Sequence, residues 1–384
     1  MRETYLAGGV RTAFGSFGGG LGGQSVSGLA AQVVQASVKR ARLSAEDVDH
    51  LVLGNTLTTT PDAPFGSRVV TLEAGLPQAT ASLGVIRACG TGLQAIASAS
   101  DQIQLGRSEV AIAAGVEVYS QAPHVIRMRW GAKRGAPPLE DMLDWAYRDP
   151  FDGALMGQTA EALTEHTGIS RDRQDDYAFA SQQRTRQAME TGILAEEILP
   201  IAGVDRDEYP RPDVTREKLA SLRSPFREGG AVTAGNSSGV NDGAAAISVL
   251  SGEAVERLGI EPIARVIDWT VVGCNPKLMG HGPVPATQAL FARTGLTAED
   301  MDVVEVNEAF AVVVLNAIDQ LGLDAERVNV HGGAIAIGHP PGATGIRMTI
   351  AAVNELRRTG GRYALLTMCL GAGQGMSMIV ESVR

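Results

Sequence analysis

Two of the three cysteines lie beside small residues at the ends of predicted elements. Cys89 occurs in Arg87-Ala-Cys-Gly-Thr-Gly-Leu93, where a strand should give way to a helix. A helix N-terminus stabilises a thiolate and small neighbours let a substrate approach, so this cysteine could be a nucleophile. Cys369 follows an apolar run and precedes a glycine-rich stretch whose N–H groups can meet a ligand. The alternative for Cys89 is an inert buried cysteine, and the alternative for the Cys369 segment is a tight turn between strands.

One histidine and one asparagine have positions that suit proton transfer and oxyanion binding. His339 lies in a loop of glycine and proline just before a predicted helix, where core packing explains a histidine poorly and a general base fits. Asn307 ends a predicted strand, so its amide could orient a water or an oxyanion, or could simply belong to a turn. Both residues are therefore candidates for a catalytic site.

Two other motifs favour different chemistry less convincingly. Gly18–Gly23 matches the glycine pattern of dinucleotide-binding proteins, but the segment has the composition of a loop rather than a strand-turn-helix. Gly235–Gly239 matches the nucleophile turn of serine hydrolases around Ser237, yet no clear helix follows it. Cys274 has no neighbouring histidine or glycine-rich context, which indicates a structural cysteine.

The composition excludes several classes of protein. Of the 384 residues, 44% are hydrophobic and 20% charged, which favours a folded protein with a large core. A net charge of −10 and the absence of any long apolar run argue against a general nucleic-acid or membrane binder. Three cysteines form neither a disulfide framework nor a zinc motif. We expect a soluble cytoplasmic protein without a metal.

An internal repeat organises the chain. Ser44–Asn55 resembles Thr297–Asn307, and Thr91–Leu93 corresponds to Thr344–Ile346 at the same offset. Strands that alternate with helices in both units predict parallel sheets covered by helical layers. The predicted helices cover residues 29–38, 93–103, 171–192 and a segment after 345, and the predicted strands cover residues 51–53, 110–114 and 364–368.

These features in this order resemble the thiolase family over nearly the whole chain. The matching segments are those around Cys89 and Cys369 together with Arg11–Gly15, Leu155–Gly157, Thr233–Gly243, Met279–Pro285, Asn307–Phe310 and Gly338–Pro340. The resemblance implies an α/β fold of duplicated βαβαβαββ halves in five layers, with an inserted loop domain. The first half would span residues 1–118 and 240–262, the insertion 119–239, and the second half 263–384.

The resemblance also implies a two-step acyl transfer. Cys89 would be the acyl-accepting nucleophile, activated by His339, and Cys369 would be the general acid and base. Asn307 would hold a water that forms one oxyanion hole with His339, and the N–H groups of Cys89 and Gly371 would form the other. No permanently bound cofactor is implied, because CoA is the substrate.

The inserted domain is expected to bind CoA. By resemblance, Arg211 contacts the nucleotide end, and a further set of residues contacts the adenine, the pantetheine or the acyl group. This set comprises Phe226, Ala234, Ser238, Met156 and Phe310. The segment Arg206–Arg227 carries six Lys or Arg and four Asp or Glu, a locally positive patch in an acidic chain. The expected partners are CoA and acyl-CoA, in a homodimer or homotetramer in which residues 121–152 could form the tetramer contact.

Three residues depart from the family pattern, and one of them bears on the substrate range. Ile86 and Thr91 replace the usual Asn and Ser, which could alter packing around Cys89. Leu155 replaces the His of biosynthetic acetoacetyl-CoA thiolases, which favours a broad-specificity 3-ketoacyl-CoA thiolase over a strictly short-chain enzyme. The other hypotheses are a decarboxylating condensing enzyme, which would use two histidines and lack Cys369, and a non-catalytic CoA- or lipid-binding relative.

Overall fold

A computed structural model describes residues 2–132 and 134–383. The main strands of the first repeat are β1 (Thr4–Thr12), β3 (His50–Gly54), β4 (Ala81–Val85), β5 (Val110–Val118) and β9 (Asn241–Ser251), and the short β2 (Gly15–Ser16) pairs with β9. The helices of this half are α1 (Val26–Arg40), α2 (Gly66–Glu73), α3 (Thr91–Gln104) and α9 (Gly252–Leu258). β5 and β9 are buried along their whole length, as expected for apolar strands covered on both faces.

The second repeat has the same kinds of element. Its strands are β10 (Ala264–Gly273), β11 (Met301–Val306), β12 (Tyr363–Leu370) and β13 (Gln374–Ser382). Its helices are α10 (Pro283–Thr294), α11 (Ala311–Leu321), α12 (Ala334–Ile337) and α13 (Pro341–Thr359).

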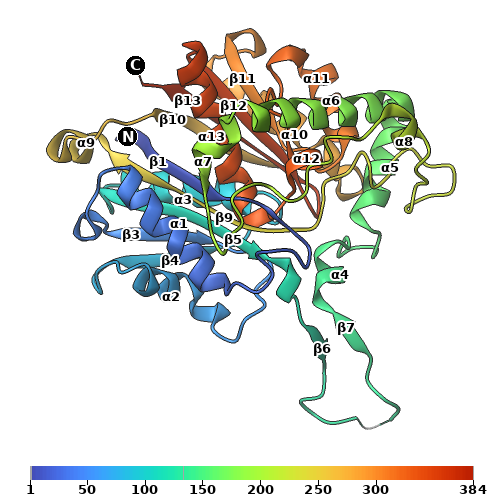
Figure 1. Ribbon diagram of the computed structural model, residues 1–384, viewed down its shortest axis with the longest axis horizontal. Coiled ribbons are helices and arrows are strands. Elements are labelled where there is room, and N and C mark those ends of the chain that lie inside the picture. The colour runs from blue at the N-terminus through green and yellow to red at the C-terminus, as the bar shows by residue number, and fades with distance from the viewer. Residues whose placement is uncertain (1, 133, 384) are drawn as a thin grey trace.

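The insertion between β5 and β9 is mainly helical and carries one projecting hairpin. It contains β6 (His124–Ile126), β7 (Leu139–Asp141), α4 (Met142–Ala146), α5 (Met156–Thr167), α6 (Arg171–Glu190), α7 (Ile193–Glu197), β8 (Ile198–Leu199) and α8 (Arg216–Ala220). Figure 1 shows the β6–β7 hairpin extending away from the layered body. β9, which follows the insertion, pairs with β1 and β5 of the first half. The domain boundaries given above stay a prediction.

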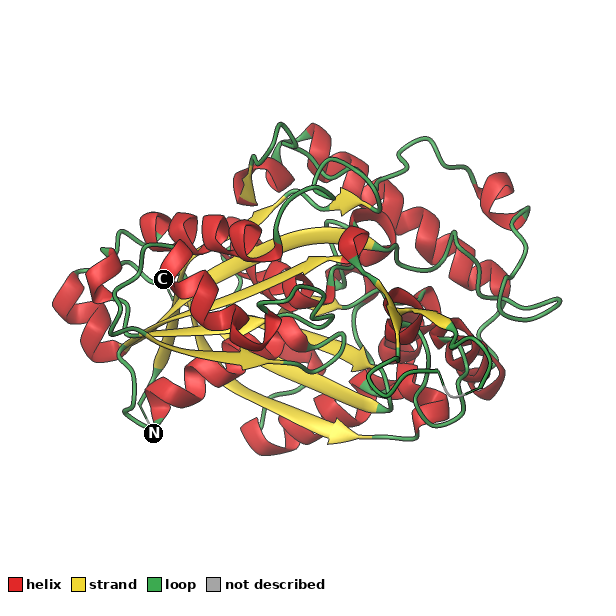
Figure 2. Ribbon diagram, turned by 90° about the horizontal axis from the view of Figure 1, so that it is seen from below, coloured by secondary structure: helices red, strands yellow, loops and turns green. Residues whose placement is uncertain are grey.

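The strands and helices form five layers. The sheet order is β11-β12-β13-β10-β1-β9-β5-β3-β4, and its two halves join where β1 pairs with β10 over Thr4–Leu6. α3 and α13 pack between the two halves in the central core. α1 and α2 cover the outer face of the first half, whereas α10 and α11 cover that of the second. Figure 2 shows the strands with helices on both faces. The expected α/β class is confirmed.

The N-termini of α3 and α13 meet through glycine. A Cβ on Gly92 would lie 2.5 Å from the carbonyl oxygen of Gly342, and a Cβ on Gly345 would lie 2.2 Å from the amide nitrogen of Leu93. Only glycine allows such a close approach of two backbones. Cys89 and His339 precede these two helices, so the contact brings the segments that carry them to one region.

The structure confirms the predicted helices as α1, α3, α6 and α13 and the predicted strands as β3, β5 and β12. It adds α2 and β4 between β3 and α3, for which no residue ranges were predicted, although a strand was expected before Cys89. β4 is an edge strand with mostly exposed side chains, so it lacks the apolar run of a buried strand. No described helix is long and apolar enough to cross a membrane.

Candidate active site

The turn that carries Cys89 connects β4 to α3 and is held by a threonine. The hydroxyl of Thr91 accepts a hydrogen bond from the N–H of Arg87 at 2.8 Å and donates to the carbonyl of Ala88 at 2.7 Å. Ala88 has a φ of +44°, a strained conformation for a residue with a Cβ. The turn therefore fixes the nucleophile candidate just before the helix. Thr91, one of the departures from the family pattern, keeps the hydroxyl that this turn uses.

Burial changes the expected state of the Cys89 thiol. Burial raises its pKa, and the N–H groups of Gly371 and of Cys89 itself lower it to a smaller extent. The sequence predicted that the helix N-terminus would favour a thiolate, whereas in the resting site desolvation is the larger effect and shifts the pKa of Cys89 upward. The thiol therefore needs a base before it can attack, and the N–H of Gly371 already lies beside the sulfur.

Cys369 closes the other side of the site. It is fully buried near the end of β12 and faces the turn that leads into β13. Ala372 in this turn has a φ of +66°, which leaves the backbone of Gly371 close to Cys89. Burial, and then the nearby Cys89, raise the pKa of Cys369 well above its ordinary value. Cys369 is thus a protonated thiol at neutral pH, able to act first as an acid.

Hydrogen bonds fix the tautomer of His339 so that one ring nitrogen is free to accept a proton. Its Nδ1 lies 2.8 Å from the hydroxyl oxygen of Thr344, and that hydroxyl donates to the carbonyl of Pro340 at 2.9 Å. Because the hydroxyl proton is used there, the oxygen accepts the proton on Nδ1 and leaves Nε2 unprotonated. Burial, and then the cationic Arg347, lower the pKa of His339 to about 3, so the ring is neutral.

Asn307 stands next to this ring. Its Nδ2 lies 3.4 Å from Nε2 of His339, and its N–H donates to the carbonyl of Thr367 at 2.9 Å, two residues before Cys369. Its Oδ1 is buried and has no hydrogen-bond partner among the described residues. An unpartnered buried acceptor of this kind suits a water or a ligand group.

The structure therefore brings the five predicted catalytic residues together in two groups, and the residues within each group lie next to one another. Cys89, Cys369 and Gly371 form one group, and His339 and Asn307 form the other. Within the described chain no hydrogen bond links the sulfur of Cys89 to His339. The two groups are joined through the α3–α13 contact and through strand β12.

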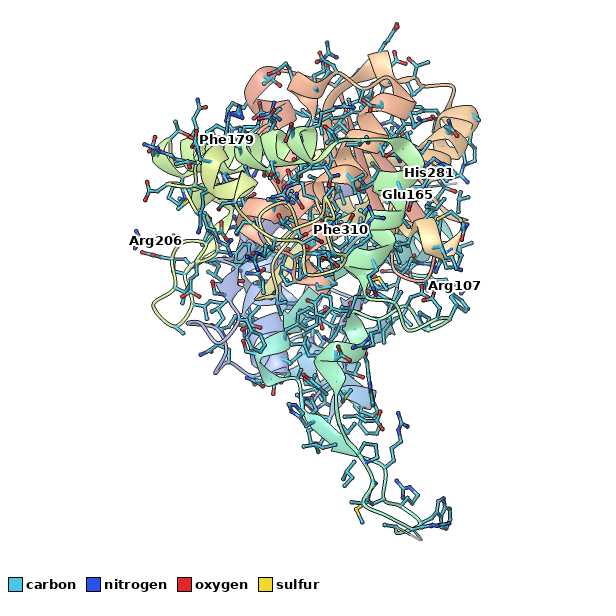
Figure 3. All side chains as sticks on the ribbon, turned by 90° about the vertical axis from the view of Figure 1, so that its right-hand side faces the viewer. Arg107, Glu165, Phe179, Arg206, His281 and Phe310 are labelled. Carbon is cyan, nitrogen blue, oxygen red and sulfur yellow. The ribbon has the colours of Figure 1, made fainter. Side chains whose placement is uncertain are left out.

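Three of the predicted binding residues form an apolar wall beside the thiols. The sulfur of Met156 lies 3.7 Å from the position that a Cβ on Gly371 would take. The rings of Phe226 and Phe310 pack edge to face with centroids 6.5 Å apart. Phe310 belongs to the same cluster as Cys369, and Figure 3 shows it towards the middle of the molecule. This arrangement suits an acyl group near Cys89.

The remaining predicted binding residues lie on the insertion. Arg211 is exposed, its guanidinium lies 5.1 Å from the centre of the Tyr209 ring, and its N–H donates to Gln182. No carboxylate pairs with Arg211 in the described chain, so its charge is available to an anion. The N–H of Ser238, a half-buried residue, donates to Ala309 at 3.0 Å, and Ala234 is exposed.

The structure argues against dinucleotide binding at Gly18–Gly23 and against Ser237 as a hydrolase nucleophile. The carboxylate of Glu208 accepts hydrogen bonds from the N–H groups of Ser16 and Gly20, so an acid occupies the glycine loop where a phosphate would have to bind. The hydroxyl of Ser237 donates to the carbonyl of Thr233 at 2.6 Å, and strand β9 rather than a helix follows. Cys274 is half-buried and donates its N–H to Gly373.

Sequence reasoning missed two supports of the site. In the sequence Thr344 stands out only as part of the internal repeat, and nothing there indicates that its hydroxyl contacts His339. Glu308 is fully buried and accepts hydrogen bonds from Tyr177, Ser181 and the N–H of Ile335, which ties the Asn307 loop to α6 and α12. Its only sequence signal is a charged residue directly after Asn307 at the end of an apolar strand.

Comparison with known families decides what this site belongs to. The family model for the thiolase N-terminal domain matches residues 4–253, and the model for the thiolase C-terminal domain matches residues 260–382. The chain belongs to the thiolase family. The resemblance and the reaction class predicted from the sequence are thereby confirmed.

Several relatives support the thiolase assignment over the whole chain. The beta-ketoadipyl-CoA thiolase of Escherichia coli and the beta-ketothiolase BktB of Cupriavidus necator are each 43% identical to this thiolase, and the alignments cover all of both chains. The crystal structure of human mitochondrial 3-ketoacyl-CoA thiolase in complex with CoA superposes with a TM-score of 0.98 at 40% identity. That comparison covers 100% of this chain and 98% of the human chain.

Proposed function

We propose that this thiolase condenses an acyl-CoA with acetyl-CoA, and cleaves 3-ketoacyl-CoA with CoA in reverse, through an acyl group on Cys89. The observation that carries the proposal is the pairing of the half-buried thiol of Cys89 with the buried thiol of Cys369, with the N–H of Gly371 at the sulfur of Cys89. A non-catalytic relative has no such requirement, since binding CoA alone needs neither two thiols nor a neutral buried histidine.

The first step transfers the acyl group to Cys89. His339, neutral and unprotonated at Nε2, takes the proton of Cys89 as the sulfur attacks the thioester carbonyl. The C–S bond to CoA then breaks, and Cys369 gives its proton to the leaving sulfur. After this step Cys89 carries the acyl group, His339 is protonated and Cys369 is a thiolate.

The second step forms the carbon–carbon bond. The Cys369 thiolate takes the α-proton of the incoming acetyl-CoA, and the resulting enolate attacks the acyl carbonyl on Cys89. The sulfur of Cys89 leaves and regains its proton from His339, so every group returns to its starting state. The N–H groups of Cys89 and Gly371 would bind the oxyanion on the acyl group, and Asn307 through a water, together with His339, would bind the enolate oxygen.

CoA would lie along the insertion, with its nucleotide end at Arg211 and its pantetheine arm beside Phe226, Ala234 and Ser238. Replacing Arg211 with alanine is expected to raise KM for CoA about three- to tenfold and leave kcat nearly unchanged, because the contact is equal in ground and transition states. Steady-state thiolysis with varied CoA measures this. Arg186→Ala removes a charge from nearby α6, where Arg186 pairs with Glu190, and should leave KM unchanged. Equal KM values for both variants and the unaltered enzyme would contradict the nucleotide site.

A broad substrate range follows from the apolar wall. Leu155 is half-buried directly before Met156, and an aliphatic side chain there suits an alkyl tail better than a histidine would. We expect thiolysis of longer 3-ketoacyl-CoA substrates with kcat/KM within about tenfold of the value for acetoacetyl-CoA, or above it. Loss of ketoacyl absorbance across a chain-length series measures this. Activity on acetoacetyl-CoA alone would instead indicate the strictly short-chain biosynthetic enzyme.

The assembly we propose is a homodimer through edge strand β4, extended to a tetramer by the hairpin. β4 is the edge strand of the first half, and the large apolar side chains of Phe65, Leu83 and Ile86 near it are 68%, 38% and 63% exposed. Ile86 therefore points away from the packing around Cys89. An exposed edge with an apolar surface is covered in most proteins, here by a second copy. Trp130 in the hairpin is 87% exposed and would lie in the tetramer contact. The cytoplasm is the proposed location, because the two working thiols must stay reduced.

A further inference from the structure

Glu117 is a buried carboxylate to which the mechanism above gives no role. It is the only charged residue of β5 and is fully buried. Oε1 accepts hydrogen bonds at 2.9 Å from Nδ2 of Asn55 and from the N–H of Leu57, and Oε2 accepts at 3.1 Å from the N–H groups of Thr56 and Gly342. Four donors fill a carboxylate, and no cation pairs with it among the described residues. Burial raises the pKa of Glu117 to about 7.

The internal repeat gives Glu117 a counterpart in the active site. Gly54 of β3 pairs with Gly115 of β5, and 252 residues later Val306 of β11 pairs with Thr367 of β12. The same step carries Glu117 onto Cys369, and it carries Asn55 onto Asn307. The first half therefore has, in the place of the acid–base thiol, a carboxylate.

The helices complete this correspondence. With one more residue of offset, Thr91 corresponds to Thr344, and Cys89 corresponds to Gly342. In the active site Cys89, before α3 of the first half, meets Cys369 of the second half. In the counterpart, Gly342 at the start of α13 meets Glu117 of the first half through a hydrogen bond. The repeat thus contains two similar contacts between the halves. One joins the thiols of Cys89 and Cys369, and the other, which we call the clamp, is the hydrogen bond between Glu117 and Gly342.

The clamp lies close to both catalytic segments. Gly342 is three residues after His339, and a Cβ on Gly342 would lie 2.3 Å from the carbonyl oxygen of Val116, so α13 begins directly on β5. On the other side, the hydroxyl of Thr56 lies 3.1 Å from that of Thr91 and 3.3 Å from the carbonyl of Ala88, in the turn that carries the nucleophile.

We propose that Glu117 is a positioning residue that holds the start of α13, and with it His339, in register with the turn of Cys89. Each half contributes one of these segments. The carboxylate accepts hydrogen bonds from the Asn55–Leu57 loop of the first half and from the N–H of Gly342 at the start of α13 in the second half. The proposal rests on the roles given above to Cys89 and His339.

Glu117→Gln tests the proposal, because the amide keeps the shape of the side chain and places an NH₂ group against one pair of N–H donors. The enzyme should lose kcat by about 10- to 100-fold, with KM for CoA unchanged, since small misplacements of a base are costly. The pH midpoint of Cys89 alkylation by iodoacetamide, followed by peptide mass spectrometry, should rise. Loss of a negative charge alone would lower that midpoint, so the sign separates positioning from through-space electrostatics. The other titratable groups that interact electrostatically with the Cys89 thiol are unchanged in this variant; they are Cys369 from β12, Tyr119 after β5 and Tyr147 after α4.

Asp49→Asn is the matched control. Asp49 directly precedes β3 and accepts hydrogen bonds from Ser108 and from the N–H groups of Glu109 and Val110, at the opposite end of β5. This variant should lower the melting temperature but keep kcat and the alkylation midpoint. A Glu117→Gln enzyme with the same kinetic profile as Asp49→Asn would overturn the proposal, as would a lowered midpoint.

Two further measurements keep the test decisive. If Glu117→Gln does not fold, Thr56→Val breaks the hydroxyl contact to the Cys89 turn and should give the same two changes, and an unaltered midpoint would overturn the proposal. If Cys89 of the unaltered enzyme shows no selective, pH-dependent alkylation, the catalytic assignment of Cys89 fails rather than the role of Glu117.

Discussion

Replacing Cys89 with serine is expected to lower kcat for both condensation and thiolysis by roughly 10⁴-fold or more. An alcohol has a far higher pKa than a thiol, so His339 cannot deprotonate it efficiently, and an oxygen ester would release its acyl group to the enolate or CoA less readily. The effect should be this large because nucleophile, base and acid act as a unit. Steady-state thiolysis and a stopped-flow search for an acyl-enzyme burst measure it.

Cys274→Ser is the matched control for this variant. Cys274 is also partly buried and lies near Cys369, but it has no role in the proposed steps. It should retain turnover within about threefold of the unaltered enzyme, as for a substitution away from the reacting atoms. Normal acyl-enzyme formation by Cys89→Ser, or its loss in Cys274→Ser, would contradict the assignment of the nucleophile.

Cys369→Ala should separate the transfer of the acyl group to Cys89 from the formation of the carbon–carbon bond. Cys89 and His339 remain, so the variant should still accept an acyl group, more slowly because the leaving CoA lacks its proton donor. Condensation requires a base for the α-proton, and general acid–base groups contribute about 10²- to 10⁴-fold, so overall turnover should fall by at least that factor. The acylated enzyme should accumulate, which quenched-flow mass spectrometry detects.

The pH dependence gives this prediction a second readout. Burial and the neighbouring Cys89 raise the pKa of Cys369, so the protonated form dominates at neutral pH and is lost only in alkaline solution. The alkaline limb of the profile of the unaltered enzyme should therefore change in Cys369→Ser, whose hydroxyl does not titrate in this range. Full turnover in Cys369→Ala would remove the acid–base role.

Sequence patterns predicted the parts of this fold that depend on local or repeated features. α6 follows from the helical spacing after Ser170, whose side chain caps it, and β5 follows from the apolar run at its start, Val110–Ala114. A strand was expected before Cys89, but the bounds of β4 could not be predicted in this way, because an edge strand buries little and its residues, Ala81–Val85, show no clear alternation. The joining of the two halves through β1 and β10 rests on long-range pairing that no local pattern encodes.

The site was predicted as a set of residues but not as an electrostatic arrangement. The motifs around Cys89, His339 and Cys369 indicated which residues take part in the reaction. The direction of the pKa shift of Cys89 depends on how deeply the other half of the chain buries it, and this reverses the expectation from the helix N-terminus. The hydroxyl of Thr344 at His339, and the carboxylate of Glu117 at Gly342, likewise exist only after the two halves pack.

The acyl group on Cys89 can be located directly, and this measurement tests the central claim. The unaltered enzyme is mixed with acetyl-CoA, quenched in acid and digested with trypsin, which places the three cysteines in three different peptides, 88–107, 266–277 and 363–384. The account predicts the added mass of one acetyl group on peptide 88–107, and its removal when CoA is added before the quench. An acetyl group on either other peptide, or none on any peptide during turnover, would contradict it.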